Sequence, residues 1–254
     1  MGALDGRTAI VTGAGRGIGA AISMALDAAG ARVALIARSS DQLNDTAATL
    51  VNEPVMIVAD LSTPDGPSEA AAAALDGLGG VDVLVNNAAI AERKDIELFT
   101  VDELDAMWNT NVRAPLLMTA AVIPSMVAQG SGAIVSISSL SGRRGTPRRA
   151  PYAATKAAID GMTRSLAMQY GPDGIRANAV APGVVATEMW NEHLAKPGVA
   201  DDVLGVIPQR RLTDATEIAA VVVFLASDAA SAITGEVISV DGGMHATVNL
   251  WPTV

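Results

Sequence analysis

The chain has 254 residues, of which 50% are hydrophobic and 17% charged, so it can bury a large core and does not have the composition of a disordered tail. It has no cysteine and only two histidines, which excludes disulfides, thiolate zinc sites and cysteine nucleophiles and leaves little material for a Ser-His-Asp triad. The net charge of -10 argues against a nucleic-acid partner, because phosphate binding needs a dominant basic face.

Short apolar or β-branched runs alternate along the chain with alanine-rich helical patterns. Strands are predicted at Thr8–Val11, Arg32–Ile36, Val55–Ala59, Val81–Val85, Ala133–Ile137, Arg176–Val180 and Val237–Val240. Helices are predicted at Gly17–Ala29, Ser39–Leu50, Ser68–Leu75, Val101–Gln129, Tyr152–Tyr170 and Ala215–Ala226. This alternation predicts one α/β domain, with a parallel sheet covered by helices on both faces. The segments Pro64–Pro67 and Gly77–Gly80 are predicted to be turns.

The first predicted strand runs directly into a glycine-rich turn, Thr12-Gly13-Ala14-Gly15-Arg16-Gly17-Ile18-Gly19. Glycine permits a tight turn, lets backbone N–H groups approach a phosphate, and leaves the positive end of the next helix facing that phosphate. The spacing does not match GxGxxG, and a glycine-rich segment can be a turn with no ligand. Its place between a strand and a helix nevertheless predicts that it binds the pyrophosphate of a dinucleotide.

Tyr152 and Lys156 stand four residues apart at the start of a predicted helix, and Ser139 lies thirteen residues before Tyr152. Positions i and i+4 share a helix face, so the Lys156 ammonium is expected beside the phenol. A positive charge there lowers the phenol pKa from its ordinary value of about 10. The pair is therefore a candidate for general acid–base catalysis, although a chance pair on an exposed helix has the same spacing.

Eight motifs follow one another in the chain: Thr12 to Gly19, Asp60-Leu61, Asn86-Asn87-Ala88, Asn111, Ser139, Tyr152 with Lys156, Pro182-Gly183 with Thr187, and Asp241-Gly242-Gly243. In their order and spacing they resemble the short-chain dehydrogenase/reductase family over nearly the whole length. The resemblance implies a doubly wound, seven-stranded Rossmann sheet in a single domain of residues 1–254. It also implies a nicotinamide cofactor and hydride exchange between that cofactor and a small ketone or secondary alcohol.

The resemblance implies catalytic roles for Asn111, Ser139, Tyr152 and Lys156. When a ketone accepts hydride, negative charge grows on its oxygen, so Tyr152 would donate a proton while Ser139 donates a second hydrogen bond. Lys156 would lower the phenol pKa and hold the nicotinamide ribose, as in the family. Asn111 would hold a water that links Lys156 to bulk solvent.

The family's cofactor contacts carry over to residues of the same motifs. Asn86 would lie near the adenosine ribose and Asp60 near the adenine amine, while Pro182-Gly183 and Thr187 would shape the nicotinamide end. The chain departs from the family's Asn-Asn-Ala-Gly motif at Ala89, where strain is expected if the position needs a glycine conformation. The expected cofactor-binding residues are Gly13, Gly15, Arg16, Gly17, Ile18, Gly19, Arg38, Ser39, Asp60, Leu61, Asn87, Ala88, Ala89, Tyr152, Lys156, Pro182, Gly183, Val185 and Thr187, and no metal site is expected.

The end of the second predicted strand, Ala37-Arg38-Ser39, bears on the choice between NAD and NADP. NAD enzymes commonly place a carboxylate here for the ribose 2′-OH, whereas NADP enzymes remove it and supply a cation for the 2′-phosphate. Ala37 fills the acidic position, Arg38 follows it, and Arg16 can reach the same phosphate from the glycine turn. NADP(H) is therefore favoured, and NAD(H) stays possible if both arginines are ordinary surface residues.

Two segments bear on the small-molecule substrate. Residues 188–209 are predicted to form a loop over the nicotinamide end, as a substrate lid with Met189, Trp190 and Leu194 as an apolar wall. An arginine cluster before Tyr152 would either recognise an anionic substrate or form a solvated loop or subunit contact. The cluster comprises Arg143, Arg144, Arg148 and Arg149.

Two alternative functions stay open. Within the family, a 3-oxoacyl-thioester (acyl-carrier-protein) reductase tends to carry basic residues just before the fifth and sixth strands, where this chain has Gln129-Gly130 and Asp173. A reductase of a small ketone is therefore preferred. A non-catalytic nucleotide-binding regulator is the alternative from another class, and the complete catalytic set argues against it.

The resemblance also implies a homotetramer, assembled through the long helices that hold Asn111 and Tyr152 and through the last strand. The tail after Gly243 carries Trp251, which is expected to pack on a neighbouring subunit. No apolar run approaches the ~20 residues that span a bilayer, and the first residues lack a signal-peptide pattern. We therefore expect a cytoplasmic protein with no membrane partner.

Overall fold

The computed structural model describes residues 2–186 and 198–246. Its strands form one parallel sheet in the order β3-β2-β1-β4-β5-β6-β7. The chain winds outward from β1 to β3 and then returns to the other side of β1, so the winding direction reverses between β1 and β4. The strands are β1 (Thr8–Thr12), β2 (Arg32–Ala37), β3 (Val55–Val58), β4 (Val83–Asn86), β5 (Gly132–Ile137), β6 (Ile175–Pro182) and β7 (Val237–Val240).

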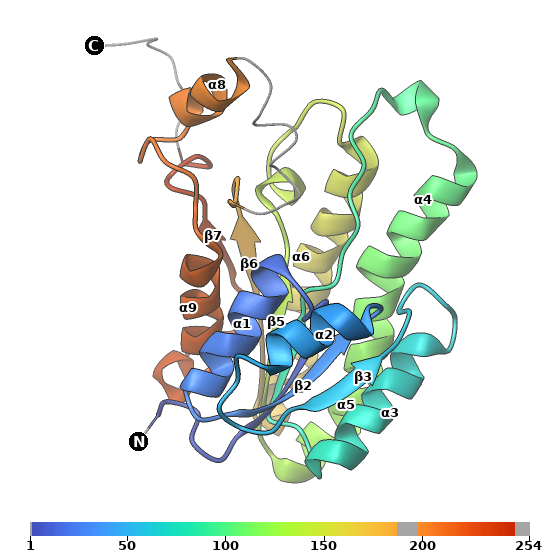
Figure 1. Cartoon of the computed structure of the whole chain (residues 1–254), viewed down its shortest axis with the longest axis vertical. Coiled ribbons are helices and arrows are strands. Elements are labelled where there is room, and N and C mark those ends of the chain that lie inside the picture. Colours follow the sequence, from blue (N-terminus) through green and yellow to red (C-terminus); the bar gives the residue numbers. More distant parts are fainter. Residues whose placement is uncertain (1, 187–197, 247–254) are drawn as a thin grey trace.

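Helices cover both faces of this sheet (Figure 1). One face carries α1 (Gly17–Ala28), α2 (Ser40–Ala47) and α9 (Ala215–Ala226), with α1 and α9 packed against each other. The other face carries α3 (Gly66–Leu78), α5 (Ala114–Gln129) and α6 (Ala150–Tyr170). The prediction of a doubly wound, seven-stranded α/β fold is confirmed.

The strands alternate between the two cores. In β1, Val11 packs on the side of α1 and α9, whereas its neighbour Ile10 packs on the side of α3 and α5. Leu35 and Ile36 of β2 divide in the same way. Because successive side chains of a strand point to opposite faces, a strand buried on both faces must be apolar throughout, which is the pattern that the sequence shows.

Two predicted elements change type in the structure, and the predicted turns Pro64–Pro67 and Gly77–Gly80 overlap the two ends of α3. The expected helix Val101–Gln129 is divided into α4 (Val101–Trp108), a π-helical segment Asn109–Arg113 and α5, because Pro115 has no N–H for the carbonyl of Asn111 four residues before it. Part of the expected loop over the site is instead helix α8 (Val199–Val206). Short 3₁₀ segments lie at Ile96–Leu98, Leu140–Gly142, Gly171–Asp173 and Asp228–Ala230.

Among the described residues, the helical run Val101–Gln129 is long and apolar enough to cross a membrane by length and composition, contrary to the sequence expectation. Half of its apolar window is buried inside the protein. Within that run, Met118, Val122 and Met126 pack in the core between the sheet and α3. Because a buried core helix passes the same test, this run is weak evidence for a membrane span.

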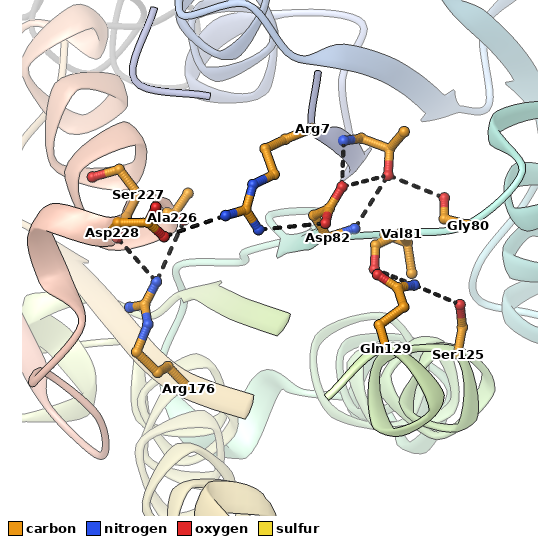
Figure 2. A network of polar contacts seen from close by, with 11 residues as sticks. Arg7, Gly80, Val81, Asp82, Ser125, Gln129, Arg176, Ala226, Ser227 and Asp228 are labelled. Atoms are coloured by element: carbon orange, nitrogen blue, oxygen red, sulfur yellow. Dashed lines mark hydrogen bonds and ion pairs between the residues drawn. The ribbon is translucent and has the colours of Figure 1, made fainter. Parts of the chain in front are cut away.

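A polar network joins the amino-terminal ends of the strands (Figure 2). Asp82, just before β4, accepts hydrogen bonds from the Thr8 backbone N–H at 2.8 Å and from Arg7 at 3.5 Å. Arg7 also pairs with Asp228 at 3.3 Å, and Arg176 of β6 donates to carbonyls at the end of α9 and to that of Ser227, at 3.2 Å, just after it. These contacts fix the edge of the sheet that lies opposite the predicted site.

Candidate functional site

The predicted site residues lie at the carboxyl ends of the strands, which meet at one edge because the sheet is parallel. The glycine turn follows β1, Arg38 follows β2, Asp60 follows β3, and Ser139 follows β5. The edge includes the position between β1 and β4 where the winding direction reverses. Open α/β sheets bind ligands at such a point.

The glycine turn is too tight for larger residues at two positions. Gly13 has φ +66°, in the left-handed region, and a Cβ on it would lie 2.9 Å from the Ala88 Cα. A Cβ on Gly19 would lie 2.0 Å from the Gly13 carbonyl oxygen. The first turn of α1 has no acidic residue and no side-chain cap at Arg16, so its positive end is directed toward an anion in the turn.

The end of β4 is joined to this turn by hydrogen bonds. The Thr12 hydroxyl accepts from the backbone N–H groups of Asn87 at 2.9 Å and Ala88 at 3.1 Å, and the Asn87 amide donates to the Thr12 carbonyl at 2.8 Å. Asn86, by contrast, is buried and donates to the Thr119 hydroxyl at 3.2 Å, and its contact with the ribose stays a prediction. The strain expected at Ala89 is also absent, since the described non-glycine residues with positive φ are Arg148 and Arg210.

Arg38 and Asp60 are exposed neighbours beyond β2 and β3. Hydrogen bonds from the Ser62 backbone at 2.9 Å and from its hydroxyl at 2.7 Å lower the pKa of Asp60, and the Arg38 guanidinium lowers it further. Ser39 caps α2 by accepting from the Gln42 N–H at 3.3 Å. The Ser39 hydroxyl oxygen is thus hydrogen-bonded within α2. Leu61, the residue after Asp60, is buried.

The structure brings Ser139, Tyr152 and Lys156 together, as the sequence predicted. Ser139 lies at the end of β5, where its hydroxyl accepts from the Ser141 N–H at 3.1 Å, and it is near enough to the Tyr152 phenol to lower the pKa of that phenol. Tyr152 is in the first turn of α6. The Lys156 ammonium is buried, donates to the Ile137 carbonyl at 2.7 Å, and lies 5.7 Å from the centroid of the Tyr152 ring.

Asn111 lies in the π-helical segment and joins two parts of the site. Its Oδ1 accepts from the Ile90 N–H at 2.8 Å, and its Nδ2 donates to the Ile90 carbonyl at 2.8 Å and to the Thr155 hydroxyl at 3.1 Å. Thr155 immediately precedes Lys156. Asn111 therefore ties the loop after β4 to α6, and its role in holding a water stays a prediction.

The pKa values around the phenol differ from the sequence expectation. Burial raises the pKa of Tyr152, while the hydrogen bond with Ser139 and the charge of Arg149 oppose that rise, so the expected net lowering is wrong. Burial lowers the pKa of Lys156 from 10.5 to about 8, and the Asp160 carboxylate partly opposes this. The lysine is thus the group of the pair that titrates closer to neutral pH.

Residues at the ends of β6 and β7 form the expected nicotinamide end. The Gly183 N–H donates to the Val240 carbonyl at 3.1 Å, and a Cβ on Gly183 would lie 2.7 Å from the Asp241 Cβ, so this turn after Pro182 also requires glycine. Val185 is buried and bridges to Thr213. Thr187, the lid residues 188–197 and the tail with Trp251 lie outside the described residues.

Sequence reasoning missed a pair that supports the site. The Ser138 hydroxyl donates to Asp160 Oδ1 at 2.5 Å and joins the end of β5 to α6. Asp160 stands four residues after Lys156, so helix spacing was a signal for its position.

The members of the arginine cluster have different partners. Arg148 pairs with Asp95, whereas the Arg149 guanidinium lies 5.5 Å from the centroid of the Tyr152 ring.

Comparison with known proteins agrees with this geometry. A family model described as Enoyl-(Acyl carrier protein) reductase matches residues 13–245. The chain belongs to the short-chain dehydrogenase/reductase family. As a member of this family it is an oxidoreductase, because its relatives are named dehydrogenases and reductases.

Three of these short-chain dehydrogenase/reductase relatives are similar over nearly their whole length. L-xylulose reductase of Bos taurus is 39% identical over 96% of this chain and 98% of its own. Galactitol 2-dehydrogenase (L-tagatose-forming) of Cereibacter sphaeroides is 40% identical over 94% of this chain and 95% of its own. The crystal structure of a gluconate 5-dehydrogenase from Burkholderia cenocepacia J2315 in complex with NADP and tartrate has a TM-score of 0.91 and 31% identity, and covers 96% of this chain and 97% of its own.

Proposed function

We propose that the protein is an NADP(H)-dependent oxidoreductase that exchanges hydride between nicotinamide and a small ketone or secondary alcohol. A single domain would hold both the cofactor and the substrate. The observation that carries this proposal is the meeting of Ser139 with the Tyr152 phenol, close enough for the serine to lower the pKa of that phenol, with the Lys156 ammonium 5.7 Å from the phenol ring. A phenol and a hydroxyl that meet at one point are suited to a carbonyl oxygen.

A dinucleotide fits the residues present. The absence of side chains at Gly13 and Gly19 keeps the turn closed against β4 and leaves backbone at the end of α1 for a pyrophosphate. At the adenosine end, Ala37 leaves the end of β2 without a carboxylate, and the exposed Arg38 places a cation there. This combination favours the 2′-phosphate of NADP. The NADP in the complex of the related gluconate 5-dehydrogenase supports this choice.

When bound, the nicotinamide supplies or accepts the hydride. In reduction, Tyr152 Oη would donate its proton to the carbonyl oxygen while the Ser139 hydroxyl donates a second hydrogen bond to it. In alcohol oxidation the same two groups would act in reverse, with Tyr152 as the base. Lys156, with a pKa of about 8, is suited to exchanging a proton near neutral pH, and Asn111 would hold the connecting water beside Thr155.

The proposed assembly is a cytoplasmic homotetramer without membrane or nucleic-acid partners. Large apolar side chains are exposed on the elements expected at its interfaces. Trp108 is 52% exposed on α4, and Met168 is 84% exposed on α6. The molar mass of the purified protein in solution tests whether four subunits assemble.

An acyl-carrier-protein reductase is the main competing function. The 3-oxoacyl-[acyl-carrier-protein] reductase of Synechocystis sp. is 36% identical to this chain, which keeps the alternative in view. Against it, the Gln129 amide donates to Ser125 at 3.0 Å and to the Val81 carbonyl at 3.4 Å, at a place where a basic docking residue is expected. Turnover of an acyl-carrier-protein thioester in preference to free ketones would decide for this alternative.

The first experiment is a parallel fluorescence titration of the purified protein with NADPH and NADH, followed by assays with a panel of sugar and aliphatic ketones. Preference for NADPH with turnover supports the proposal. Preference for NADH overturns the assignment of 2′-phosphate binding to Arg16 and Arg38, and leaves the proposed hydride-transfer reaction unchanged. Tight NADPH binding without turnover of any ketone or thioester would favour a nucleotide-binding regulator.

A further inference from the structure

The segment before α6 is held in an unusual backbone conformation. Arg148 has φ +63°, in the left-handed region that non-glycine residues seldom adopt. Two contacts with the loop after β4 hold it there. Its guanidinium pairs with Asp95 through two hydrogen bonds of 2.8 and 2.9 Å, and its carbonyl accepts from the Lys94 N–H at 3.1 Å. The path of the chain into α6 is therefore fixed by the loop after β4.

This arrangement places the next residue, Arg149, against the proposed proton donor. Arg149 is the N-cap residue of α6, and its side chain is partly buried. Its guanidinium carbon lies 5.5 Å from the centroid of the Tyr152 ring, and the Lys156 ammonium lies 5.7 Å from the same centroid. Two cations thus lie at nearly equal distances from one phenol ring.

We propose that Arg149 is a positioning residue that acts through Tyr152, stabilising its phenolate form. The proposal rests on the proposed function, because it assigns proton transfer to Tyr152. A cation within about 6 Å of an aromatic ring is attracted to it, and the attraction grows when the phenol becomes an anion. Arg149 would therefore favour the form of Tyr152 that accepts a proton from an alcohol.

The two cations differ in the pH range over which they keep their charge. Burial lowers the pKa of Lys156 to about 8, whereas burial raises the pKa of Tyr152 above its ordinary value of 10. Lys156 consequently loses its charge before the phenol titrates. Arginine keeps its charge throughout this range. Arg149 is then the cation that remains beside Tyr152 as the phenolate forms.

The surrounding charges are consistent with this division. Burial lowers the pKa of Arg149, Tyr152 raises it, and Arg93 from the loop after β4 lowers it. Asp160, also on α6, acts on Lys156 and accepts from Ser138 at 2.5 Å. The titratable and charged groups that face the phenol or its two cations are Arg93 from the loop after β4, Arg149 at the N-cap of α6, and Lys156 and Asp160 within α6.

The test compares Arg149→Gln with Arg149→Lys. In Arg149→Gln, the apparent pKa of the base in alcohol oxidation is expected to rise by about one unit, so kcat/KM on the acid side falls about tenfold. Arg149→Lys should recover most of this loss, and NADPH affinity should be unchanged in both. The matched control is Arg144→Gln, which removes a charge from the same segment. The Arg144 side chain donates to the Met244 carbonyl.

A second readout does not depend on turnover. The chain has two tyrosines, so Tyr170→Phe leaves Tyr152 as the one phenol whose ionisation is followed by tyrosinate absorbance. In that background Arg149→Gln should move the titration to higher pH, and Arg144→Gln should not. If Arg149→Gln leaves the tyrosinate titration unmoved, the proposal is overturned. It is also overturned if the pH profile of kcat/KM is unmoved and only the KM for anionic substrates rises, because Arg149 would then bind the substrate. A shifted titration without turnover would retain the effect on Tyr152 while refuting the proposed function.

Discussion

Replacing Lys156 by methionine is expected to stabilise the protein while abolishing turnover. The ammonium is buried, with 3% of the residue exposed, and burial lowers its pKa from 10.5 to about 8. A lysine with a lowered pKa is less stable as a cation in the folded protein than in the unfolded chain. Methionine is unbranched and of similar length, so it fills the same space without the charge.

The magnitude follows from the pKa values. A shift of about 2.5 units at about 1.36 kcal/mol per unit corresponds to roughly 3 kcal/mol at pH 7, where the lysine is charged in both states. Loss of the 2.7 Å hydrogen bond to the Ile137 carbonyl offsets about 1 kcal/mol. The net gain of about 2 kcal/mol corresponds to a rise in Tm of about 4–8 °C for a chain of this size.

The gain should depend on pH. Between pH 8 and 10.5 the unfolded chain binds the lysine proton and the folded protein releases it, so the stability of the wild type rises with pH. The advantage of Lys156→Met should therefore be present at pH 7 and lost by about pH 10.5. Denaturant unfolding of the cofactor-free protein at pH 7 and pH 10 measures both values.

A matched control is Lys94→Met. Lys94 is partly exposed and pairs with Glu103 at 2.5 Å, so its removal should leave Tm unchanged or lower it. The reasoning is refuted if Lys156→Met is less stable than the wild type at pH 7, or if its advantage is the same at pH 7 and pH 10. Either result would mean that burial does not oppose the charge of Lys156.

Three further substitutions test the site. Tyr152→Phe should keep NADPH affinity and lower kcat at least about 100-fold, because it removes the proton and keeps the ring; unchanged turnover would contradict the assignment. Arg38→Ala should weaken NADPH binding by about tenfold or more and leave NADH binding unchanged in the same titration, and an equal loss for both would show that Arg38 does not bind the 2′-phosphate. Gly19→Ala should abolish cofactor binding and lower Tm by several degrees, since its Cβ would lie 2.0 Å from the Gly13 carbonyl oxygen. An unchanged Tm with unchanged cofactor affinity would show that the turn has room for a side chain.

The sequence predicted those elements whose ends carry strong local signals. Helix α9 has its predicted bounds, Ala215–Ala226, because Asp214 and Glu217 form a capping box at its start. The division between α4 and α5 was missed since the apolar pattern continues through Asn109–Arg113. Pro115 was a signal for the division, but Pro124 lies inside α5 without ending it, so proline alone does not identify the interruption.

The sequence predicted which residues of the site meet, and it was wrong about the energetics of the phenol. Helix spacing places Lys156 near Tyr152, and strand order places Ser139 beside them. The direction of the Tyr152 pKa depends on how much of the phenol is covered by the packed elements, which no local pattern records. The position of Arg149 over the ring depends on the contact between Arg148 and Asp95, which are far apart in sequence.

The relative position of the proposed proton carriers depends on a contact that carries no catalytic role of its own. Ser138 directly precedes Ser139, and Asp160 lies one helical turn after Lys156, so the 2.5 Å bond between Ser138 and Asp160 joins the segment that holds Ser139 to the helix that holds Tyr152 and Lys156. Asp160 also raises the pKa of Lys156, against the effect of burial. Loss of this carboxylate should therefore lower the pKa of Lys156 below about 8 and loosen the contact between Ser139 and Tyr152, so the geometry of the site and its working pH range are set by the same side chain.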